Sequence, residues 1–458
     1  MQVAPQDETL SARSAAAIRD ALPPGGLFAN QTWRTAVAPF AIGEKLAGEL
    51  ESLGRVLLQF YRAANLLHRQ SSEGRQPEWV ARWLDQGKSA ELLRLQHAPA
   101  FKNELPRVIR PDILLTDEGF AITELDSVPG GIGLTAWLNQ TYGKAESGKQ
   151  KAEIIGGERG MLDGFASIFG DAKQVHIVVS EEAATYRPEM EWLAGQLNEP
   201  KHSTPINREQ TFNIQPSTFN AFSPGDAVYR FFELFDLANV PNSSRIFELA
   251  EAGHIRVTPP PKPCLEEKLL FALLWNRNLA DFWHQQLGAG FFQRLKQHVP
   301  YTWVVDPAPL PPQGAIPELN LTDWQQLKTL SQRERNLILK ISGHSERAWG
   351  ARGVYLGNDL SHADWAAAVD GALKDFPTSP FVLQRYHKPR TVETKWYDFD
   401  ASQLRTMPGR VRLCPYYFVT GEGSAARANL GGVLATIVPA DKKIVHGMTD
   451  AVLAPCSV

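Results

Sequence analysis

The spacing of hydrophobic and polar residues changes along this chain, and each spacing predicts a local structure. Through residues 1–104, apolar side chains recur at the spacing of one face of an α-helix. The pattern predicts helices over Ser11–Leu22, Ile42–Leu67 and Glu78–Leu95. We therefore expect residues 1–104 to form a helical N-terminal region.

The spacing switches to alternation on both sides of Asp117-Glu118-Gly119, which predicts a β-hairpin with a three-residue loop. Gly119 would supply a positive φ in that loop. The register of such a hairpin places four pairs of residues opposite one another: Thr116 and Phe120, Leu114 and Ile122, Asp112 and Glu124, and Arg110 and Asp126.

Four charged side chains of the hairpin should share a face, because residues two apart in a strand point the same way. Arg110 would then lie beside Asp112, Glu124 and Asp126, and like charges held opposite one another are destabilising. Three carboxylates beside one arginine need a further cation, and oxygen ligands of this kind suit Mg²⁺. A solvated hairpin without a metal is the alternative, and the spacing alone does not decide between them.

A glycine-rich segment, Ser127–Gly133, follows the hairpin and precedes a predicted helix. Glycine lets backbone N–H groups approach a ligand, and a helix N-terminus attracts anions. We therefore expect Ser127 and Gly130 to contact a phosphate or carboxylate of the substrate.

Residues 160–262 alternate short apolar runs with helical patterns, which predicts a small α/β unit with a mostly parallel sheet. In such sheets ligands bind beyond the carboxyl ends of the strands. Glu181 and Glu182 directly follow the first strand, where they could bind a cationic amine or favour the start of the next helix. The expected strands are Val175–Val179, Ala227–Phe232 and His254–Thr258, and the expected helices are Tyr186–Leu197 and Ser243–Ala252.

The proline-rich segment Thr258–Cys264 predicts a stiff connector and a domain boundary. Beyond it we expect a helix over Leu265–Phe282 that carries Lys268, and a second proline-rich loop over Pro307–Pro317.

Lys340 lies in an apolar predicted strand, Asn336–Ile341, and a buried ammonium is costly without a partner anion. The segment Gly343–Gly353, with glycines at 350 and 353, suits a loop that closes over phosphates. A lysine reaching out from a strand end is the alternative for Lys340. Further strands are predicted over Phe381–Tyr386, Arg410–Phe418 and Arg427–Gly432.

Composition narrows the class of protein. The 458 residues, 43% hydrophobic and 21% charged, are typical of a soluble chain large enough for several units. A formal net charge of −3 gives no indication of nucleic-acid binding, and no apolar run reaches the ~20 residues of a membrane span. Three cysteines, Cys264, Cys414 and Cys456, lack the spacing of a disulfide framework or a thiolate zinc site. With no signal-peptide pattern at the start, we expect a cytoplasmic protein.

Taken in order, these stretches resemble the ATP-grasp superfamily in its circularly permuted form, and most of all glutathionylspermidine synthase-type ligases. Arg110-Pro-Asp112 and Glu124-Leu-Asp126 are similar to the family's arginine and its Asp, Glu and Asn magnesium ligands. The Glu181-Glu182 pair resembles an acidic motif on the substrate side. The other similar stretches are the Lys268 segment, like a helix that contacts ATP, Lys340 with its glycine loop, like a second phosphate lysine, and Gln384-Arg385-Tyr386, like the strand that joins the two halves of the adenine site.

The resemblance implies an α/β (α+β) ATP-grasp fold. Residues 105–159 would hold the metal-binding hairpin and glycine loop, residues 160–262 a pre-ATP-grasp-like unit, and residues 263–458 the nucleotide-binding region. One or two Mg²⁺ would bind Asp112, Glu124 and Asp126, and Arg110 would act on the transferred phosphoryl group. The residues expected at ATP are Lys268, Lys340, Gly350, Gly353, Gln384, Arg385, Tyr386, Arg427 and Asn429; Arg412 receives no role.

The implied activity is ATP-dependent ligation of a small-molecule carboxylate and an amine, through an acyl phosphate. Asp126 departs from the family's Asn, and no cysteine precedes Cys264, so the amidase domain of bifunctional members is absent. A non-catalytic nucleotide-binding regulatory protein and a kinase-like phosphotransferase are the alternatives. The sequence identifies neither the two substrates nor an oligomeric state.

Overall fold

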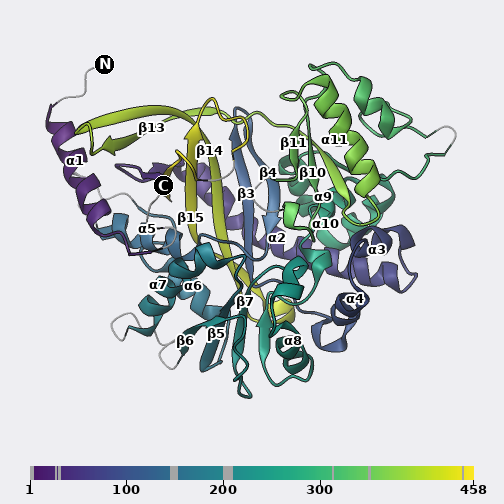
Figure 1. Cartoon of the computed structure of the whole chain (residues 1–458), viewed down its shortest axis with the longest axis horizontal. Helices are drawn as coiled ribbons and strands as arrows, with labels where there is room; N and C mark the ends of the chain where they lie inside the picture. Colours follow the sequence, from purple (N-terminus) through teal and green to yellow (C-terminus); the bar gives the residue numbers. More distant parts are fainter. Residues whose placement is uncertain are drawn as a thin grey trace.

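Three β-sheets meet near the middle of the structure, with helices packed around them (Figure 1). The computed structural model describes residues 5–25, 28, 32–144, 153–199, 210–311, 314–348, 352–445 and 448–458, with the backbone alone for residues 5–10. Within these ranges, no helix combines the length and the apolar surface that a membrane span needs.

The largest sheet has eight strands, and a long antiparallel pair, β14 (Gln403–Thr420) and β15 (Arg427–Pro439), lies within it. The order is β1-β16-β15-β14-β3-β4, with β13 also pairing with β14 and β2 with β16. The hairpin of β3 (Val108–Thr116) and β4 (Gly119–Asp126) therefore forms one edge of this sheet. The remaining strands are β1 (Arg34–Thr35), β2 (Phe40–Ala41), β13 (Thr391–Asp398) and β16 (Val452–Ser457).

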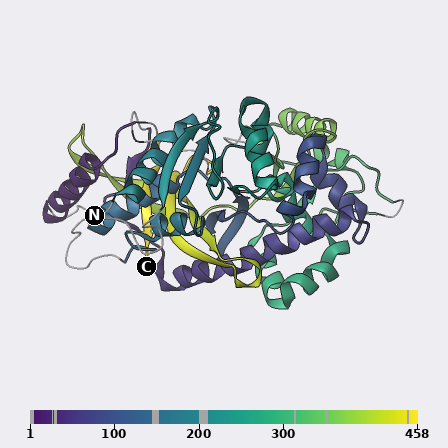
Figure 2. The same ribbon diagram turned by 90° about the horizontal axis from the view of Figure 1, so that it is seen from below.

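Helices cover both faces of this sheet. The long α2 (Gly43–Ser72) runs along one face, where it contacts β3, β14 and β15 (Figure 2). Helices α5 (Ile132–Lys144) and α6 (Gly160–Ser167) cover the other face. Alternation along β14 matches this layering: Leu413 and Tyr417 join the core around α2, whereas Cys414 and Tyr416 join the core around α5 and α6.

The hairpin confirms the predicted charged pairs but corrects the predicted loop. Arg110 lies opposite Asp126 and Asp112 opposite Glu124, whereas Thr116 pairs with Gly119, so the loop has two residues rather than three. The expected pairs of Thr116 with Phe120 and of Leu114 with Ile122 are wrong, since Leu114 pairs with Ala121. The register shifts between Asp112 and Ile113, where Thr123 is the extra residue of a β-bulge. Because a one-residue slip reverses the faces of a strand, this bulge is what returns Glu124 and Asp126 to the face of Arg110 and Asp112.

The N-terminal region is helical, with two short strands that join the large sheet. Helix α1 spans Pro5–Asp20, and the predicted helix Glu78–Leu95 is two helices, α3 (Glu78–Asp85) and α4 (Ala90–His97). The break contains Gly87, whose φ of 75° is outside the helical region, and Ser89, whose hydroxyl caps α4.

The predicted helix over Leu265–Phe282 is also divided. It consists of a 3₁₀ turn at Pro263–Leu265, helix α9 (Leu269–Trp275) and the start of α10 (Ala280–His298). Lys268 therefore precedes α9 as its N-cap residue instead of lying within a helix. The connector Thr258–Cys264 is buried, so it is no exposed linker.

The two smaller sheets have four strands each. One is parallel, as predicted, with the order β6-β5-β7-β8, and its β6 was not predicted. The other is antiparallel, with the order β11-β10-β12-β9 and helix α11 (His362–Asp375) against it. The bounds are β5 Gln174–Val179, α7 Arg187–Asn198, β6 Thr211–Pro216, β7 Ala227–Phe231, α8 Ser243–Glu251, β8 Arg256–Thr258, β9 Thr302–Val304, β10 Leu337–Ile341, β11 Val354–Leu356 and β12 Phe381–Arg385.

The start of α5 does attract an anion, but the anion is a side chain of this protein. The buried carboxylate of Glu189 on α7 accepts hydrogen bonds from the N–H groups of Gly131, at 2.7 Å, and Leu134, at 2.9 Å. Burial raises the pKa of Glu189 to about 7, against the lowering effect of these two bonds and of Arg110. Glu189 thereby fixes the segment that leads from the hairpin into α5.

Replacing Glu189 by alanine should lower the free energy of unfolding by about 1–3 kcal/mol, because two buried N–H groups lose their acceptor. Since the folded protein holds the Glu189 proton more tightly than the unfolded chain, its contribution is largest below the ordinary pKa of 4.5 and decreases as the pH rises through about 7. Urea unfolding over this pH range measures the difference. The control is Glu191→Ala, an exposed position on the same helix, and a difference that increased with pH would contradict this account.

Candidate active site

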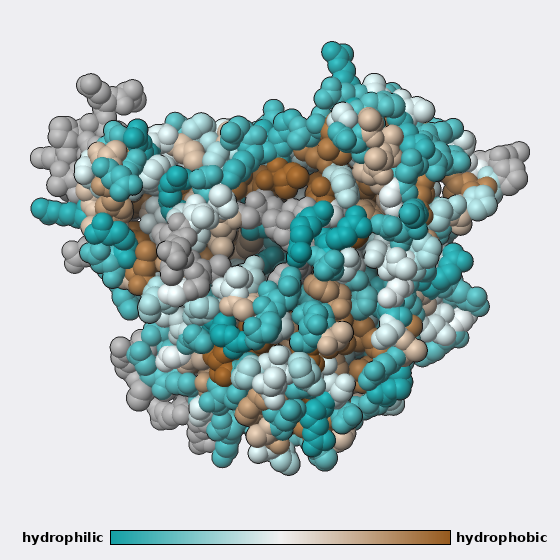
Figure 3. Space-filling model, viewed as in Figure 1, coloured by the Kyte–Doolittle hydropathy of each residue, from teal (hydrophilic) through white to brown (hydrophobic). Residues whose placement is uncertain are grey.

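A cavity of about 380 Å³ lies where the three sheets approach one another. The hairpin β3–β4 and β14 form one wall, β10 and β12 form another, and residues at the carboxyl ends of β5 and β7 form a third. The molecular surface is hollowed near the centre of the view in Figure 3. Eleven residues predicted for the site line this cavity: Arg110, Asp112, Glu124, Asp126, Gly130, Glu182, Lys268, Lys340, Gln384, Arg385 and Tyr386.

Asp112 lies between two arginines at the base of the cavity. Its carboxylate is 3.2 Å from Nε of Arg110 and 3.0 Å from Nη1 of Arg412, and it accepts a hydrogen bond from the Cys414 thiol at 3.6 Å. Burial raises the pKa of Cys414 to about 11, which keeps the thiol protonated as a donor. Asp112 is thus a buried carboxylate that forms ion pairs with two arginines and accepts hydrogen bonds from Arg412 and Cys414.

Arg110 joins Asp112 to Asp126. Its Nη2 is 2.9 Å from Oδ2 of Asp126, and its Nη1 donates to the carbonyl of Gly130 at 3.1 Å. Burial raises the pKa of Asp126, and the carboxylates of Glu124 and Asp112 raise it further, while Arg110 opposes both. A cation near Asp126 would therefore be stabilised by all three carboxylates.

Glu124 is paired with Lys268 across the mouth of the cluster. Nζ of Lys268 lies 2.7 Å from Oε1 of Glu124, and the Glu124 side chain keeps 34% of its exposure. Burial by itself would lower the pKa of Lys268, but Glu124, Asp126 and Glu267 raise it above its usual value. Lys268 is positioned by backbone contact, since its N–H donates to the carbonyl of Ser342.

Lys340 is a buried ammonium that donates hydrogen bonds to neutral acceptors. Alternation along β10 turns Leu337, Leu339 and Ile341 into the core under α11 and leaves Lys340 facing the cavity. Its Nζ bonds Oε1 of Gln384 at 2.9 Å and the carbonyl of the bulged Thr123 at 3.4 Å. Within the described ranges it forms no ion pair, and burial lowers its pKa to about 8. This is the environment expected of a lysine that awaits an anion.

The cavity also has an apolar part and a second charged rim. Glu182 pairs with Arg352 at 3.3 Å, and Lys443 pairs with Asp359. Ile338 lies opposite Gln384 in the antiparallel sheet. Apolar residues elsewhere in the lining of the cavity are Leu114, Val128, Ala183, Phe231, Phe232, Ala348, Val354, Ile444 and Val445, and such surface suits a planar base.

Several predicted residues lie elsewhere. Arg427 donates to the carbonyls of Ser424 and Ala426, and Asn429 pairs with Phe418, at the other end of the sheet from Arg412. Glu181 and Gly353 are next to lining residues but do not line the cavity themselves, and Gly350 lies outside the described residues. Ser127 is buried and lines a smaller cavity of about 80 Å³, which shares Glu124, Asp126 and Lys268 with the larger one.

Arg412 lines the cavity but was not among the predicted site residues, and Arg352, His387 and Lys443 are further examples. On β14, Arg412 points to the same face of the sheet as Cys414 and Tyr416. It pairs with Leu114 on β3, which is two residues from Asp112. The signal for it was alternation on β14, but that signal is readable only when β14 is known to pair with β3. Arg412 also changes the charge balance, because Arg110, Arg412, Lys268 and Lys340 oppose three carboxylates.

The donor set fits magnesium. Asp112, Glu124 and Asp126 offer carboxylate oxygens alone, which are the hard ligands that Mg²⁺ selects. In the structure, however, cations of the protein hold all three carboxylates. The predicted need for a further cation is therefore met by Arg412 and Lys268, and the surplus positive charge favours an anionic ligand.

Comparisons with known proteins define the fold. No protein-family profile and no curated protein sequence matches the chain. Among solved structures, it aligns with a glutathione synthetase-like effector from Globodera pallida in the apo form, with a TM-score of 0.58 and 11% identity over 100% of this chain and 98% of that one. The chain therefore shares the overall fold of that glutathione synthetase-like protein. A candidate gamma-glutamylcysteine synthetase from Methylobacillus flagellatus KT aligns with a TM-score of 0.40 and 10% identity over 92% and 89% of the two chains, which is too weak to add to this conclusion.

Asp112→Ala should lower the free energy of unfolding by about 3 kcal/mol or more, because it leaves buried arginines without their shared anion. Glu124→Ala should cost less, about 1–2 kcal/mol, because the Glu124 side chain is 34% exposed and Asp126 and Glu267 remain to stabilise the charge of Lys268. Urea unfolding of both variants at the same pH measures the difference. Equal losses of unfolding free energy for the two substitutions would contradict the expectation that the more buried carboxylate contributes more to stability.

Proposed function

We propose that this protein is an ATP- and Mg²⁺-dependent ligase that joins a carboxylate to an amine through an acyl phosphate, as glutathionylspermidine synthase-type ligases do. The observation that carries the proposal is the convergence of three carboxylates with two buried lysines on one cavity. The fold shared with a glutathione synthetase-like protein supports it independently. The permuted order of the family is part of the proposal, with the hairpin preceding both of the smaller sheets in the chain.

A bound nucleotide would replace ion pairs that the cavity residues form with one another. Lys268 and Lys340 would bind the phosphates, and Lys268 would then release Glu124. The freed carboxylate, together with Asp126 and Asp112, would hold Mg²⁺ carried by the nucleotide. When bound, Mg²⁺ supplies neutralisation of charge on the phosphate oxygens. Gln384, Arg385 and Tyr386, together with the apolar lining residues, would hold the base.

The reaction proceeds by activation of a carboxylate. An oxygen of the substrate carboxylate attacks the γ-phosphorus, the bond to the β-phosphate oxygen breaks, and ADP leaves. The amine then attacks the carbonyl carbon, and phosphate leaves as the amide forms. Arg110 and Arg412 lie where they can stabilise the charge on the transferred group. Glu182 at the rim is suited to a cationic amine substrate.

ADP release distinguishes the ligase from its alternatives. With ATP, Mg²⁺ and a pool of amino acids, small peptides and polyamines, release should require both an acid and an amine. Release with one substrate would indicate a kinase-like phosphotransferase, and nucleotide binding without release would indicate a regulatory protein. Either of these two results would overturn the proposal.

Glu124→Gln should reduce this ADP release about 100-fold or more, because the site loses a metal-binding charge. The matched control is Glu118→Gln at the exposed turn of the same hairpin, which should keep wild-type turnover. Full activity of the Glu124 variant would exclude this carboxylate from the reaction.

Affinity for Mg²⁺-ATP should decrease as the pH rises through about 8, where Lys340 loses its proton in the nucleotide-free protein. The decrease should approach about tenfold per pH unit, because one charged group is lost. Lys340→Met should bind ATP more weakly and lose this pH dependence, whereas the surface variant Lys328→Met should keep it. Calorimetric titration measures both, and a pH dependence that persists in Lys340→Met would assign it to another group.

A further inference from the structure

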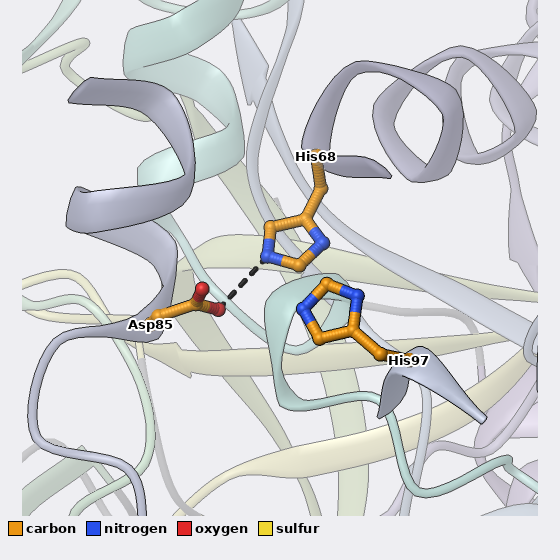
Figure 4. A group of neighbouring side chains, drawn as sticks. All are labelled: His68, Asp85 and His97. Carbon is orange, nitrogen blue, oxygen red and sulfur yellow. Dashed lines mark hydrogen bonds and ion pairs between the residues drawn. The ribbon is translucent and has the colours of Figure 1, made fainter. Parts of the chain in front are cut away.

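We propose that the helical N-terminal region contains a second, separate metal site, formed by His68, Asp85 and His97, which binds Zn²⁺ or a similar late first-row divalent ion. One ligand atom of each residue lies within 4.8 Å of the others. Figure 4 shows the three side chains turned toward one another from three separate segments. None of them lines the ATP-site cavity.

The three ligands come from the carboxyl-terminal ends of three helices. His68 lies near the end of α2, Asp85 is the last residue of α3, and His97 is the last residue of α4. A helix carries a partial negative charge at its C-terminus. Three such ends at one place favour a cation independently of the side chains.

The donor set distinguishes this site from the hairpin. Two imidazole nitrogens with one carboxylate suit zinc, copper or nickel better than they suit Mg²⁺, which prefers oxygen ligands alone. Metal–nitrogen bonds of about 2.0–2.1 Å place ligand atoms closer together than 4.8 Å. The His97 ring, stacked on His68 at 23° between the ring planes, must therefore move inward and turn so that a nitrogen of each ring points at the ion. His97 is exposed at the end of a short helix and is the ligand free to make this movement.

The surrounding contacts orient the ligands. Oδ1 of Asp85 accepts hydrogen bonds from Nε2 of His68, at 2.8 Å, and from Nε2 of Gln96, at 2.7 Å. His68 is buried, stacks on His97 at 5.2 Å between ring centroids, and also interacts with the thiol of Cys264. The amine of the neighbouring Lys262 is bonded to Asn65 and to the carbonyls of Lys102 and Glu104. In the structure a proton links His68 to Asp85, and the metal would replace that proton.

The site has an entry path and a structural consequence. The exposure of His97 opens one side to solvent, which gives an ion access and leaves a coordination position for water. Cys264 belongs to the turn Pro263–Leu265, which contacts α2 and α3 and is followed by Lys268. A bound ion would therefore tie α2, α3 and α4 together behind the segment that carries Lys268.

The test uses the full chain, treated with EDTA, in excess Mg²⁺, and titrates it with ZnCl₂ by calorimetry and with CoCl₂ by visible absorption. Wild type should bind one equivalent of Zn²⁺ and give the absorption of four- or five-coordinate Co²⁺. His97→Ala and Asp85→Ala should weaken binding about tenfold or more. His254→Ala, another exposed histidine, and Glu124→Gln, at the ATP site, should leave it unchanged.

Thermal unfolding provides a second measurement. The unfolding midpoint of wild type should rise with Zn²⁺ concentration, and that of His97→Ala should rise less at the same concentration, because the variant binds the ion more weakly. His97 is exposed, so its variant should fold. The proposal would be overturned if wild type did not bind Zn²⁺, or if His97→Ala and Asp85→Ala bound it with the affinity of wild type. Loss of Zn²⁺ binding in Glu124→Gln would also overturn it.

Discussion

The carboxylate of Asp112 lies between Arg110 and Arg412 in the interior of the protein, and the remaining site charges are arranged around this contact. Arg110 extends the network to Asp126, and Lys268 closes it at Glu124. A buried charge without a partner costs several kcal/mol, so each of these groups limits where the others can lie. Lys340, with bonds to neutral acceptors, is the member of the network that an anion would complete.

The fold brings these charges together by placing three sheets around one cavity. The large sheet presents the hairpin and β14, the antiparallel sheet presents Lys340 and Gln384, and the parallel sheet presents the region of Glu182. Strand alternation assigns each polar residue to the cavity and its neighbours to a core. The bulge at Thr123 has two effects, because it turns Glu124 and Asp126 to the correct face and offers a carbonyl to Lys340.

Local patterns in the sequence predicted much of this. Alternation predicted the hairpin, the strand of Lys340 and the parallel unit, and it placed four charged residues on one face. Features that depend on distant contacts were not predictable. The N-terminus of α5 is occupied by Glu189 from α7. The choice of Arg412 over Asn429 depends on the register of β14 against β3, which sets Arg412 opposite Leu114, near Asp112, and Phe418, the partner of Asn429, opposite Val108. The bulge has no signature in an alternating strand. The turn of the hairpin is one residue shorter than predicted, and the extra residue of the bulge offsets that difference, so the charged pairs keep their predicted register.

Two metal chemistries would then be separated within one chain: oxygen ligands at the hairpin, which a nucleotide would complete, and nitrogen-containing ligands between α2, α3 and α4. The 3₁₀ turn at Pro263–Leu265 lies between them, since it packs against α2 and α3 and leads along the chain into Lys268. The ATP site is the more constrained of the two, because its three carboxylates are already held by cations of the protein and, within the part of the chain that the structure describes, only Lys340 among its central charges lacks an anion.

The most direct test is a crystal structure with a non-hydrolysable ATP analogue and Mn²⁺, whose anomalous scattering locates the metal. The account predicts an anomalous peak between the carboxylates of Glu124 and Asp126 and the triphosphate, with Lys268 moved from Glu124 to a phosphate. A nucleotide bound away from this cavity, or a bound nucleotide with the Lys268–Glu124 pair intact and no metal at the hairpin, would contradict it.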